Sequence, residues 1–234
     1  MALTRLASSS DAPFPPVEHA LDDGLLSVGG DLSAQRLLNA YQHGVFPWFN
    51  KHDPILWWSP DPRMVLFTDN IKLSKSLKKT LRTTSLTVSF DRAFRQVITA
   101  CAQLRSDADD SDNHTWIHPE MIDAYTDLHE QGYAHSVECW QGDKLVGGLY
   151  GIAIGHMFFG ESMFSSVRDS SKIAFVTLCQ QLAQWGFPLI DCQVYSSHLE
   201  SLGAEEIDRA DFITMMTTLC EQPRANETWQ YPNE

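Results

Sequence analysis

The stretch that decides the fold runs from residue 135 to residue 160 and reads HSVECWQGDKLVGGLYGIAIGHMFFG. Three runs that favour strands are separated within it by Gln141-Gly142-Asp143 and by Gly155-His156. Short glycine-containing segments between such runs are typical of hairpin turns. The pattern predicts an antiparallel meander of three strands, over residues 136–140, 145–154 and 157–160.

The segments around this meander carry both helical and extended spacing. Downstream, we predict a helix over residues 170–185, a strand over 189–194 and a final helix around 211–219. Upstream, we predict strands over residues 64–67 and 86–90, each followed by a helix. Strands and helices mixed in this order indicate the α+β fold class.

The first 62 residues differ from the rest in composition. Ser33 can cap a helix over residues 34–43. After it, residues 45–63 hold four prolines among five aromatic residues, which excludes a regular helix or a central strand. We therefore expect a small N-terminal domain over residues 1–62, closed by this aromatic and proline-rich junction, and a larger domain over residues 63–234.

The net charge of the chain is −13, which argues against non-specific binding along nucleic acid, because phosphate contacts need Lys and Arg. One segment is an exception, because it places four basic residues on one stripe of a predicted helix: Lys75, Lys78, Lys79 and Arg82. No Asp or Glu lies between residues 70 and 90. The stripe can therefore follow a phosphate backbone, although a charged helix face can also be merely solvated.

Cysteine usage indicates a reducing compartment, and hydropathy indicates no membrane-spanning segment. The five cysteines are scattered, with no C-x-x-C pair for zinc or redox chemistry. No stretch reaches the apolar length of a transmembrane helix, and the N-terminus lacks the pattern of a secretory signal. We therefore expect a cytoplasmic protein with free thiols, no metal site and no membrane partner.

The order of the elements resembles the GNAT acetyltransferase fold, in which three hairpin-connected strands precede a helix and a further strand. A GNAT enzyme wraps the pyrophosphate of coenzyme A in a glycine-containing loop before its central helix. Here the corresponding stretch, residues 165–170, contains no glycine, although close approach of backbone to phosphate favours glycine. We therefore expect a GNAT-like domain that lacks the coenzyme A phosphate loop.

Longer strings resemble the leucyl/phenylalanyl-tRNA-protein transferase family along nearly the whole chain. They span residues 24–26, 29–33, 46–49, 54–63, 160–164, 190–193 and 201–204. The resemblance implies an aminoacyltransferase that moves Leu or Phe, and Met less well, from Leu-tRNA or Phe-tRNA to the N-terminal Arg or Lys of acceptor proteins. It implies no cofactor, because the ester is already activated, and it implies that acceptors are marked for degradation by the N-end rule pathway. An acidic insert, with four Asp in residues 106–112, departs from the family.

Asp191 and Gln193 lie two residues apart on a predicted strand, so their side chains share one face while Cys192 points the other way. The resemblance places such an Asp and Gln at the reaction centre. It implies that Asp191 polarises or deprotonates the attacking amine and that Gln193 relays or orients it. The alternative is a strand-end pair that ties down loop backbone.

Glu161 directly follows a predicted apolar strand, where a buried carboxylate needs a cationic or donor partner. The resemblance implies that this partner is the α-ammonium of the aminoacyl group, with Met163 and Phe164 adding apolar surface. The alternative is a Lys or Arg inside the fold. Trp48 and Trp116 are our candidates for lining the aminoacyl or terminal adenosine site, because indole offers a broad face and an N–H donor; either ring could instead belong to the core.

Two other functions compete with aminoacyl transfer. A GNAT-like N-acetyltransferase would use acetyl-CoA as donor, and the missing glycines of its phosphate loop count against it. An RNA-binding or adaptor protein would use only the basic helix and the aromatic rings. That function would leave Glu161, Asp191 and Gln193 without a purpose.

Overall fold

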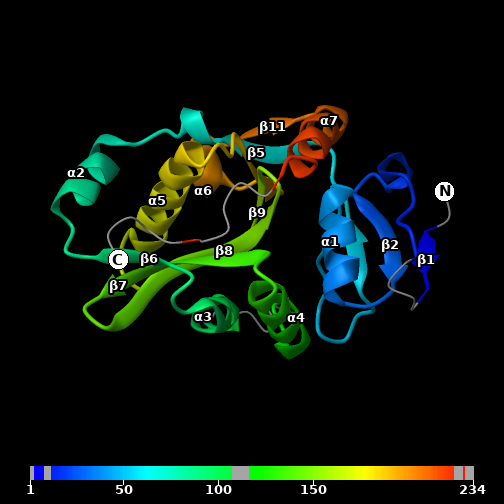
Figure 1. Ribbon diagram of the computed structural model, residues 1–234, viewed down its shortest axis with the longest axis horizontal. Helices are drawn as coiled ribbons and strands as arrows, with labels where there is room; N and C mark the ends of the chain where they lie inside the picture. Colours follow the sequence, from blue (N-terminus) through cyan, green and yellow to red (C-terminus); the bar gives the residue numbers. More distant parts are fainter. Residues whose placement is uncertain (1–2, 8–11, 107–115, 224–228, 230–234) are drawn as a thin grey trace.

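The computed structural model describes residues 3–7, 12–106, 116–223 and 229, and it contains a small sheet, a large sheet and helices packed against both (Figure 1). The fold class is α+β, as expected. Most of the acidic insert, residues 107–112, lies outside the described residues. No helix within the described ranges combines the length and apolarity needed to cross a bilayer.

The small sheet comes from the first 58 residues and lies at the N-terminal end of the molecule (Figure 1). Its strands, in spatial order, are β1 (Thr4–Leu6), β2 (Leu25–Gly29), β4 (Leu56–Trp58) and β3 (Phe46–Pro47). The expectation that residues 45–63 contain no central strand is wrong, because β4 lies within them, between β2 and the edge strand β3. Pro47 is tolerated there because β3 is an edge strand, where a missing N–H leaves no ladder bond unmade.

The 3-10 turn η1 (Val17–His19) precedes β2, and helix α1 (Ala34–Gln42) follows it. The Ser33 hydroxyl accepts a hydrogen bond from the Arg36 N–H, which is the predicted N-cap. Leu37, Ala40 and Tyr41 on α1 are fully buried. They belong to one apolar cluster that continues into the larger part of the molecule. The proposed domain boundary at residue 62 therefore stays a prediction.

The large sheet has seven strands in the order β11-β5-β10-β9-β8-β7-β6. Their bounds are β5 (Arg63–Phe67), β6 (Thr87–Phe90), β7 (Ala134–Gln141), β8 (Lys144–Ile154), β9 (Met157–Ser165), β10 (Leu189–Gln193) and β11 (Glu205–Ile207). The predicted meander is confirmed as β7, β8 and β9. β10 runs parallel to β9, and all other neighbours in this sheet are antiparallel.

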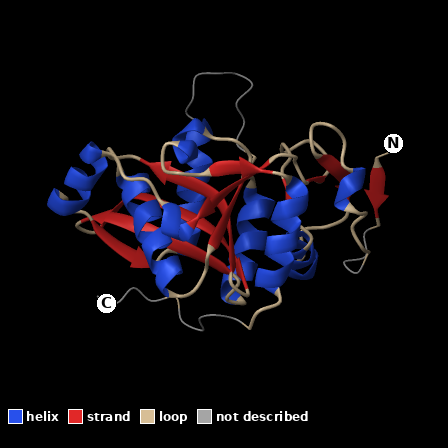
Figure 2. Ribbon diagram, turned by 90° about the horizontal axis from the view of Figure 1, so that it is seen from above, coloured by secondary structure: helices blue, strands red, loops and turns tan. Residues whose placement is uncertain are grey.

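Helices cover both faces of the large sheet (Figure 2). Helix α5 (Ser170–Gln184) lies along one face, and α3 (Phe94–Ser106), α4 (Pro119–Glu130) and α7 (Arg209–Cys220) pack on the other. The alternation of β8 explains this division, since Leu149 and Ala153 join the apolar cluster under α5 whereas Tyr150 and Ile152 join the opposite cluster. The remaining short elements are η2 (Thr68–Asn70), α2 (Lys75–Thr83) and α6 (Ser197–Glu200).

Strand β9 is longer than the predicted segment, and this changes the position of Glu161. The pairing of β9 with β8 passes from Gly160 opposite Gly151 to Ser162 opposite Tyr150. Glu161 is therefore the extra residue of a bulge inside the strand, and it does not follow the strand as expected. A bulge bends the strand locally and re-aims the side chain at that point.

Candidate active site

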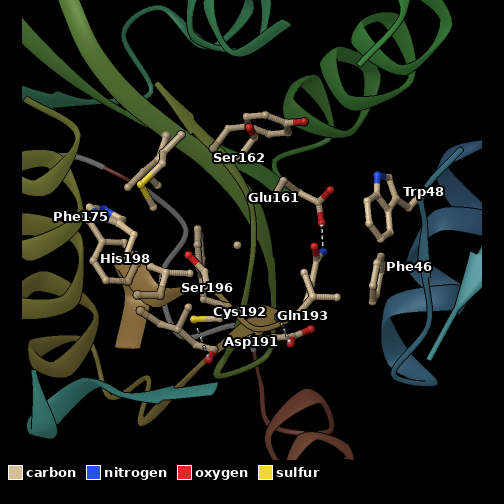
Figure 3. A pocket seen from close by; sticks show the side chains of 18 of the residues that line it. Phe46, Trp48, Glu161, Ser162, Phe175, Asp191, Cys192, Gln193, Ser196 and His198 are labelled. Atoms are coloured by element: carbon tan, nitrogen blue, oxygen red, sulfur yellow. Dashed lines mark hydrogen bonds between the residues drawn. The ribbon is translucent and has the colours of Figure 1, made fainter. Parts of the chain in front are cut away.

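A cavity of about 240 Å³ opens where β9 and β10 lie next to the edge of the small sheet (Figure 3). The residues around it come from β3, β8, β9, β10, α5 and the segment that includes α6. Glu161, Asp191 and Gln193 line it together with Trp48 and Trp116. Met163 lines it as well, so the fold brings six of the predicted site residues to one cavity.

Glu161 lies at the centre of a hydrogen-bond network. The hydroxyl of Tyr41 on α1 donates to Glu161 Oε1 over 2.7 Å, and that of Tyr125 on α4 donates to Oε2 over 3.1 Å. The two hydroxyls also contact each other. The side-chain amide of Gln193 donates to Oε1 over 2.7 Å (Figure 3). The partner inside the fold is therefore a set of neutral donors, and the expected alternative of a Lys or Arg partner is not observed among the described residues.

This environment shifts the protonation of the network. Burial raises the pKa of Glu161 to about 7, the nearby negative charge of Asp191 adds to the rise, and the hydrogen bonds from both tyrosines and Gln193 limit it. Burial also raises the pKa of Tyr41 and of Tyr125 well above the ordinary value, and the charge of Glu161 raises both further. Near neutral pH, Glu161 is therefore the group of this network that can gain or lose a proton.

Asp191 is fully buried and bonded on both carboxylate oxygens. Arg63 on β5 donates from Nε to Oδ1 over 2.8 Å and from Nη2 to Oδ2 over 2.7 Å. Oδ1 also accepts the backbone N–H of Gln193 over 2.9 Å. The contact with loop backbone that the sequence left open as an alternative is thus present. The participation of Asp191 in proton transfer stays a prediction.

The part of the cavity away from Trp48 is lined mainly by apolar side chains. Its apolar residues are Leu149, Phe158, Met163, Phe175, Leu178, Ile190 and Cys192, and the polar residues Ser162, Ser196 and His198 also line the cavity. Phe164 does not line the cavity, although it was expected to add to the aminoacyl site. Its ring packs in the core instead, because neighbouring residues of β9 face opposite sides of the sheet. A Cβ atom placed on Gly148 would lie 3.3 Å from this ring.

The two tryptophans differ in exposure. Trp48 is 44 % exposed, so its ring is not part of the core. Its carbonyl accepts a hydrogen bond from the indole of Trp58 over 2.6 Å, which fixes the backbone of this segment. Trp116 is half-buried and lines the same cavity. Both residues therefore border the cavity.

The basic residues of α2 do not reach the cavity. Lys75, Lys78, Lys79 and Arg82 are all exposed on α2, and Leu77 on the opposite side anchors the helix in the apolar cluster under α5. Their use as a phosphate-binding stripe stays a prediction. In the residues with described positions, no group of three His, Cys, Asp or Glu is arranged to hold a metal ion.

Sequence reasoning missed Tyr41, Tyr125 and Arg63 as members of the site. Tyr41 and Tyr125 have the helical spacing of ordinary core residues, and they lie 84 residues apart. Arg63 lies 128 residues from Asp191. No local pattern marks such contacts, because they depend on how the elements pack.

Comparisons with known proteins identify the family of this chain. A family model described as leucyl/phenylalanyl-tRNA protein transferase matches residues 65–217, and the model of the N-terminal domain of that family matches residues 30–61. The chain belongs to this family. The matched ranges include Glu161, Asp191 and Gln193 as well as Trp48.

Relatives within the leucyl/phenylalanyl-tRNA protein transferase family match almost end to end. The transferase of Nitrosomonas eutropha is 55% identical over 224 residues, which is 95% of this chain and 94% of the relative. The transferase of Nitrosospira multiformis is 54% identical over 97% of both chains. Among solved structures, a conserved protein of unknown function from Bacteroides thetaiotaomicron shares 11% identity over 73% of this chain and 57% of its own, with a TM-score of 0.42.

Proposed function

We propose that this protein transfers Leu or Phe, and Met less readily, from aminoacyl-tRNA to the N-terminal Arg or Lys of acceptor proteins. The observation that carries this proposal is the joining of a largely apolar cavity to Glu161, a carboxyl group whose pKa lies near 7. An apolar pocket selects Leu and Phe but discriminates only modestly against a side chain of similar size, such as that of Met. The reaction would take place in the cytosol and mark its products for the N-end rule pathway.

The donor would occupy the whole cavity. Its α-ammonium pairs with Glu161, and its side chain enters the apolar part beside Met163. The terminal adenosine lies against Trp48 and Trp116, because a broad ring face stacks on any base. Lys75, Lys78, Lys79 and Arg82 contact the phosphate backbone, which gives salt-sensitive binding with little dependence on sequence.

Transfer then requires one bond to form and one to break. The uncharged amine of the acceptor attacks the ester carbonyl and the new C–N bond forms. The C–O bond to the ribose then breaks, and the proton that the amine nitrogen loses balances the one that the ribose oxygen takes up. The side-chain amide of Gln193 donates to Glu161, which leaves its oxygen to accept from the incoming amine and orient it. Asp191, whose oxygens are already bonded, supports Gln193 in this role.

We also infer that residues 63–234 form a GNAT-like domain, with residues 1–62 as a smaller N-terminal domain. The antiparallel meander, followed by α5 and a β10 that runs parallel to β9, supports this relation. Acetyl-CoA is the disfavoured donor. Asp169 occupies the N-cap position of α5, so it puts a negative charge where a coenzyme A pyrophosphate would have to bind.

The proposal is tested by offering two labelled donors to the intact protein, Leu-tRNA labelled in the leucyl group and acetyl-CoA labelled in the acetyl group. The acceptor is a peptide that begins with Arg, and the control is the same peptide with a blocked N-terminus. We expect leucyl label in the free peptide alone. Entry of acetyl label, or of no label from either donor, would show the proposal to be wrong.

A further inference from the structure

One buried cation of this site has no role in the reaction described above. Arg63 begins β5, and its side chain is 1% exposed. It binds both oxygens of Asp191 in a fork, with N–O distances of 2.8 and 2.7 Å. Its Nη1 is buried without a hydrogen-bond partner among the residues that the structure describes. An arginine that leaves a buried donor unpaired is costly for stability, so the fork calls for a functional explanation.

Two aromatic rings also lie close to the guanidinium group. Its Cζ atom lies 4.8 Å from the centre of the Phe46 ring and 4.7 Å from that of the Phe212 ring. Phe46 comes from β3 of the small sheet, and Phe212 comes from α7. Cation–π contacts with two rings restrict the position of the fork, and an ammonium group on a flexible chain cannot reproduce the bidentate geometry. The carboxylate of Asp191 is therefore fixed in turn.

The fixed carboxylate of Asp191 in turn holds the backbone of Gln193 in place through a hydrogen bond. Gln193 has a φ of +65°, a left-handed conformation that side chains other than glycine rarely adopt. It ends β10 at a bulge, where Asp191 pairs with Val65 but Gln193 pairs with Met64. The bond from the Gln193 N–H to Asp191 Oδ1, 2.9 Å long, holds this turn closed. The turn directs the Gln193 side chain to Glu161, which it meets at 2.7 Å.

We propose that Arg63 is a positioning residue that holds the side-chain amide of Gln193 at the reaction centre through the carboxylate of Asp191. Arg63 is not among the residues that line the cavity. Asp191 acts in the same chain of contacts, as the link between the fork and the strained turn. The inference rests on the proposed function only in the use that the reaction makes of Gln193.

The test compares Arg63→Lys with Arg36→Lys. Arg36 is a matched control, because it is also fully buried, stacks on a ring (Phe14) and bonds to main-chain carbonyls, but it lies on α1 outside the cavity. We expect Arg63→Lys to lower kcat on the order of 100-fold, as misplacement of an aligned group does, while the KM for Leu-tRNA changes by less than about twofold. Arg36→Lys should lower the unfolding temperature but leave kcat unchanged.

A double-mutant cycle with Gln193→Ala separates positioning from a general structural effect. If Arg63 acts through Gln193, Arg63→Lys should change kcat by less than about twofold once Gln193 is absent. If the loss of kcat in the double variant equals the product of the losses in the two single variants, the proposal is wrong. Should Arg63→Lys not fold, Phe212→Leu removes one stacking ring, keeps the fork, and should show a smaller kcat loss with the same dependence on Gln193.

A second measurement needs no substrate. The Gln193 side-chain amide gives a ¹H–¹⁵N NMR signal that we expect to shift or split in Arg63→Lys and to stay in place in Arg36→Lys. An unshifted signal in a folded Arg63→Lys protein with normal kcat would overturn the inference. If the unchanged protein transferred no Leu, the proposed function would fail, but the NMR signal would still decide whether Arg63 positions Gln193.

Discussion

Glu161 is a carboxyl group placed where its own charge is disfavoured. The bulge in β9 points it at two phenols and an amide, all neutral donors, and burial raises its pKa to about 7. A donor with a free α-ammonium would supply the missing positive charge. At the scale of the residue, the described hydrogen-bond donors to Glu161 are thus all uncharged, and burial of a carboxylate among such donors is costly.

The pH dependence of the reaction should report this group. Only ionised Glu161 pairs with an ammonium, so kcat/KM for Leu-tRNA should rise with pH up to about 7 and then level. Glu161→Gln should lower kcat/KM at pH 8 on the order of 100-fold and remove the rising limb of the pH profile below pH 7. Rates measured from pH 5.5 to 8.5 check the expectation. A variant that keeps the limb would show that another group titrates.

Glu161 should also make stability depend on pH. Its pKa in the folded protein lies above the ordinary value of 4.5, so its contribution to stability is fully present below pH 4.5 and is lost as pH rises through about 7. The free energy of unfolding of Glu161→Gln, minus that of the unchanged protein, should therefore be larger at pH 8 than at pH 5 by about 1 to 3 kcal/mol. Urea unfolding at both pH values measures it, and Glu130→Gln on the exposed end of α4 should show no such gain.

At the scale of the element, two hairpin turns look alike in sequence but differ in what they touch. Gly142 joins β7 to β8 with a φ of +60°, and Gly155 joins β8 to β9 with a φ of +57°. A Cβ atom at Gly142 would meet nothing within 4 Å. At Gly155 it would lie 2.3 Å from the carbonyl oxygen of Leu219, at the end of α7. The second turn is therefore a docking site for the last helix.

Alanine at these two glycines should separate backbone conformation from packing. Gly142→Ala should cost about 1 kcal/mol, because a side chain disfavours a positive φ. Gly155→Ala should cost at least about 2 kcal/mol more, because backbone atoms of α7 must also move. Thermal unfolding of the two variants gives the comparison. Equal losses would mean that α7 is free to shift at this point.

Helix α2 presents a different kind of surface, basic and remote from the cavity. Charge reversal of Lys75 and Arg82 should weaken Leu-tRNA binding and reduce the dependence of log Kd on log salt by about one for each phosphate that the variant no longer binds. Lys144→Glu, at the start of β8, is the control for charge alone. A minimal donor, leucyl-adenosine, should react equally well with all variants. Equal loss with both donors would exclude a phosphate-binding stripe.

At the scale of the whole molecule, the site exists only because the small and large sheets share a core. Tyr41 comes from α1 of the N-terminal part, yet its ring packs 5.2 Å from that of Phe159 on β9 and its hydroxyl binds Glu161. Phe46 and Phe212 hold Arg63 from opposite ends of the chain. Neither part of the molecule alone would contain a complete set of contacts around Glu161.

Removal of one hydroxyl from across this junction should be detectable at Glu161. The hydrogen bond from Tyr41 lowers the pKa of Glu161, so Tyr41→Phe should raise it and move the lower limb of kcat/KM to higher pH. Tyr125→Phe should do the same to a smaller extent, because its bond is 3.1 Å rather than 2.7 Å long. Tyr133→Phe, outside the cavity, is the control. An unmoved limb in Tyr41→Phe would contradict the network.

The sequence by itself determined the local features of this protein. Hairpin turns, the capped helix α1 and the basic face of α2 all follow from backbone geometry and short spacings. The regular alternation expected for Asp191, Cys192 and Gln193 is interrupted, because β10 shifts register between Asp191 and Gln193. The family resemblance also came from strings of adjacent residues. Such features persist in any packing of the elements, so they can be inferred without it.

Only the tertiary structure decided what each of these side chains touches. Arg63 and Asp191, or Tyr41 and Glu161, are more than 100 residues apart, and nothing in their own neighbourhoods marks them as partners. Packing also decided that Phe164 belongs to the core and that Trp48 faces solvent. The physical reason is that several elements meet at this point. Their packing buries Glu161 and so raises its pKa, and it also holds Gln193 in its strained turn. No single segment of the chain can specify such a meeting.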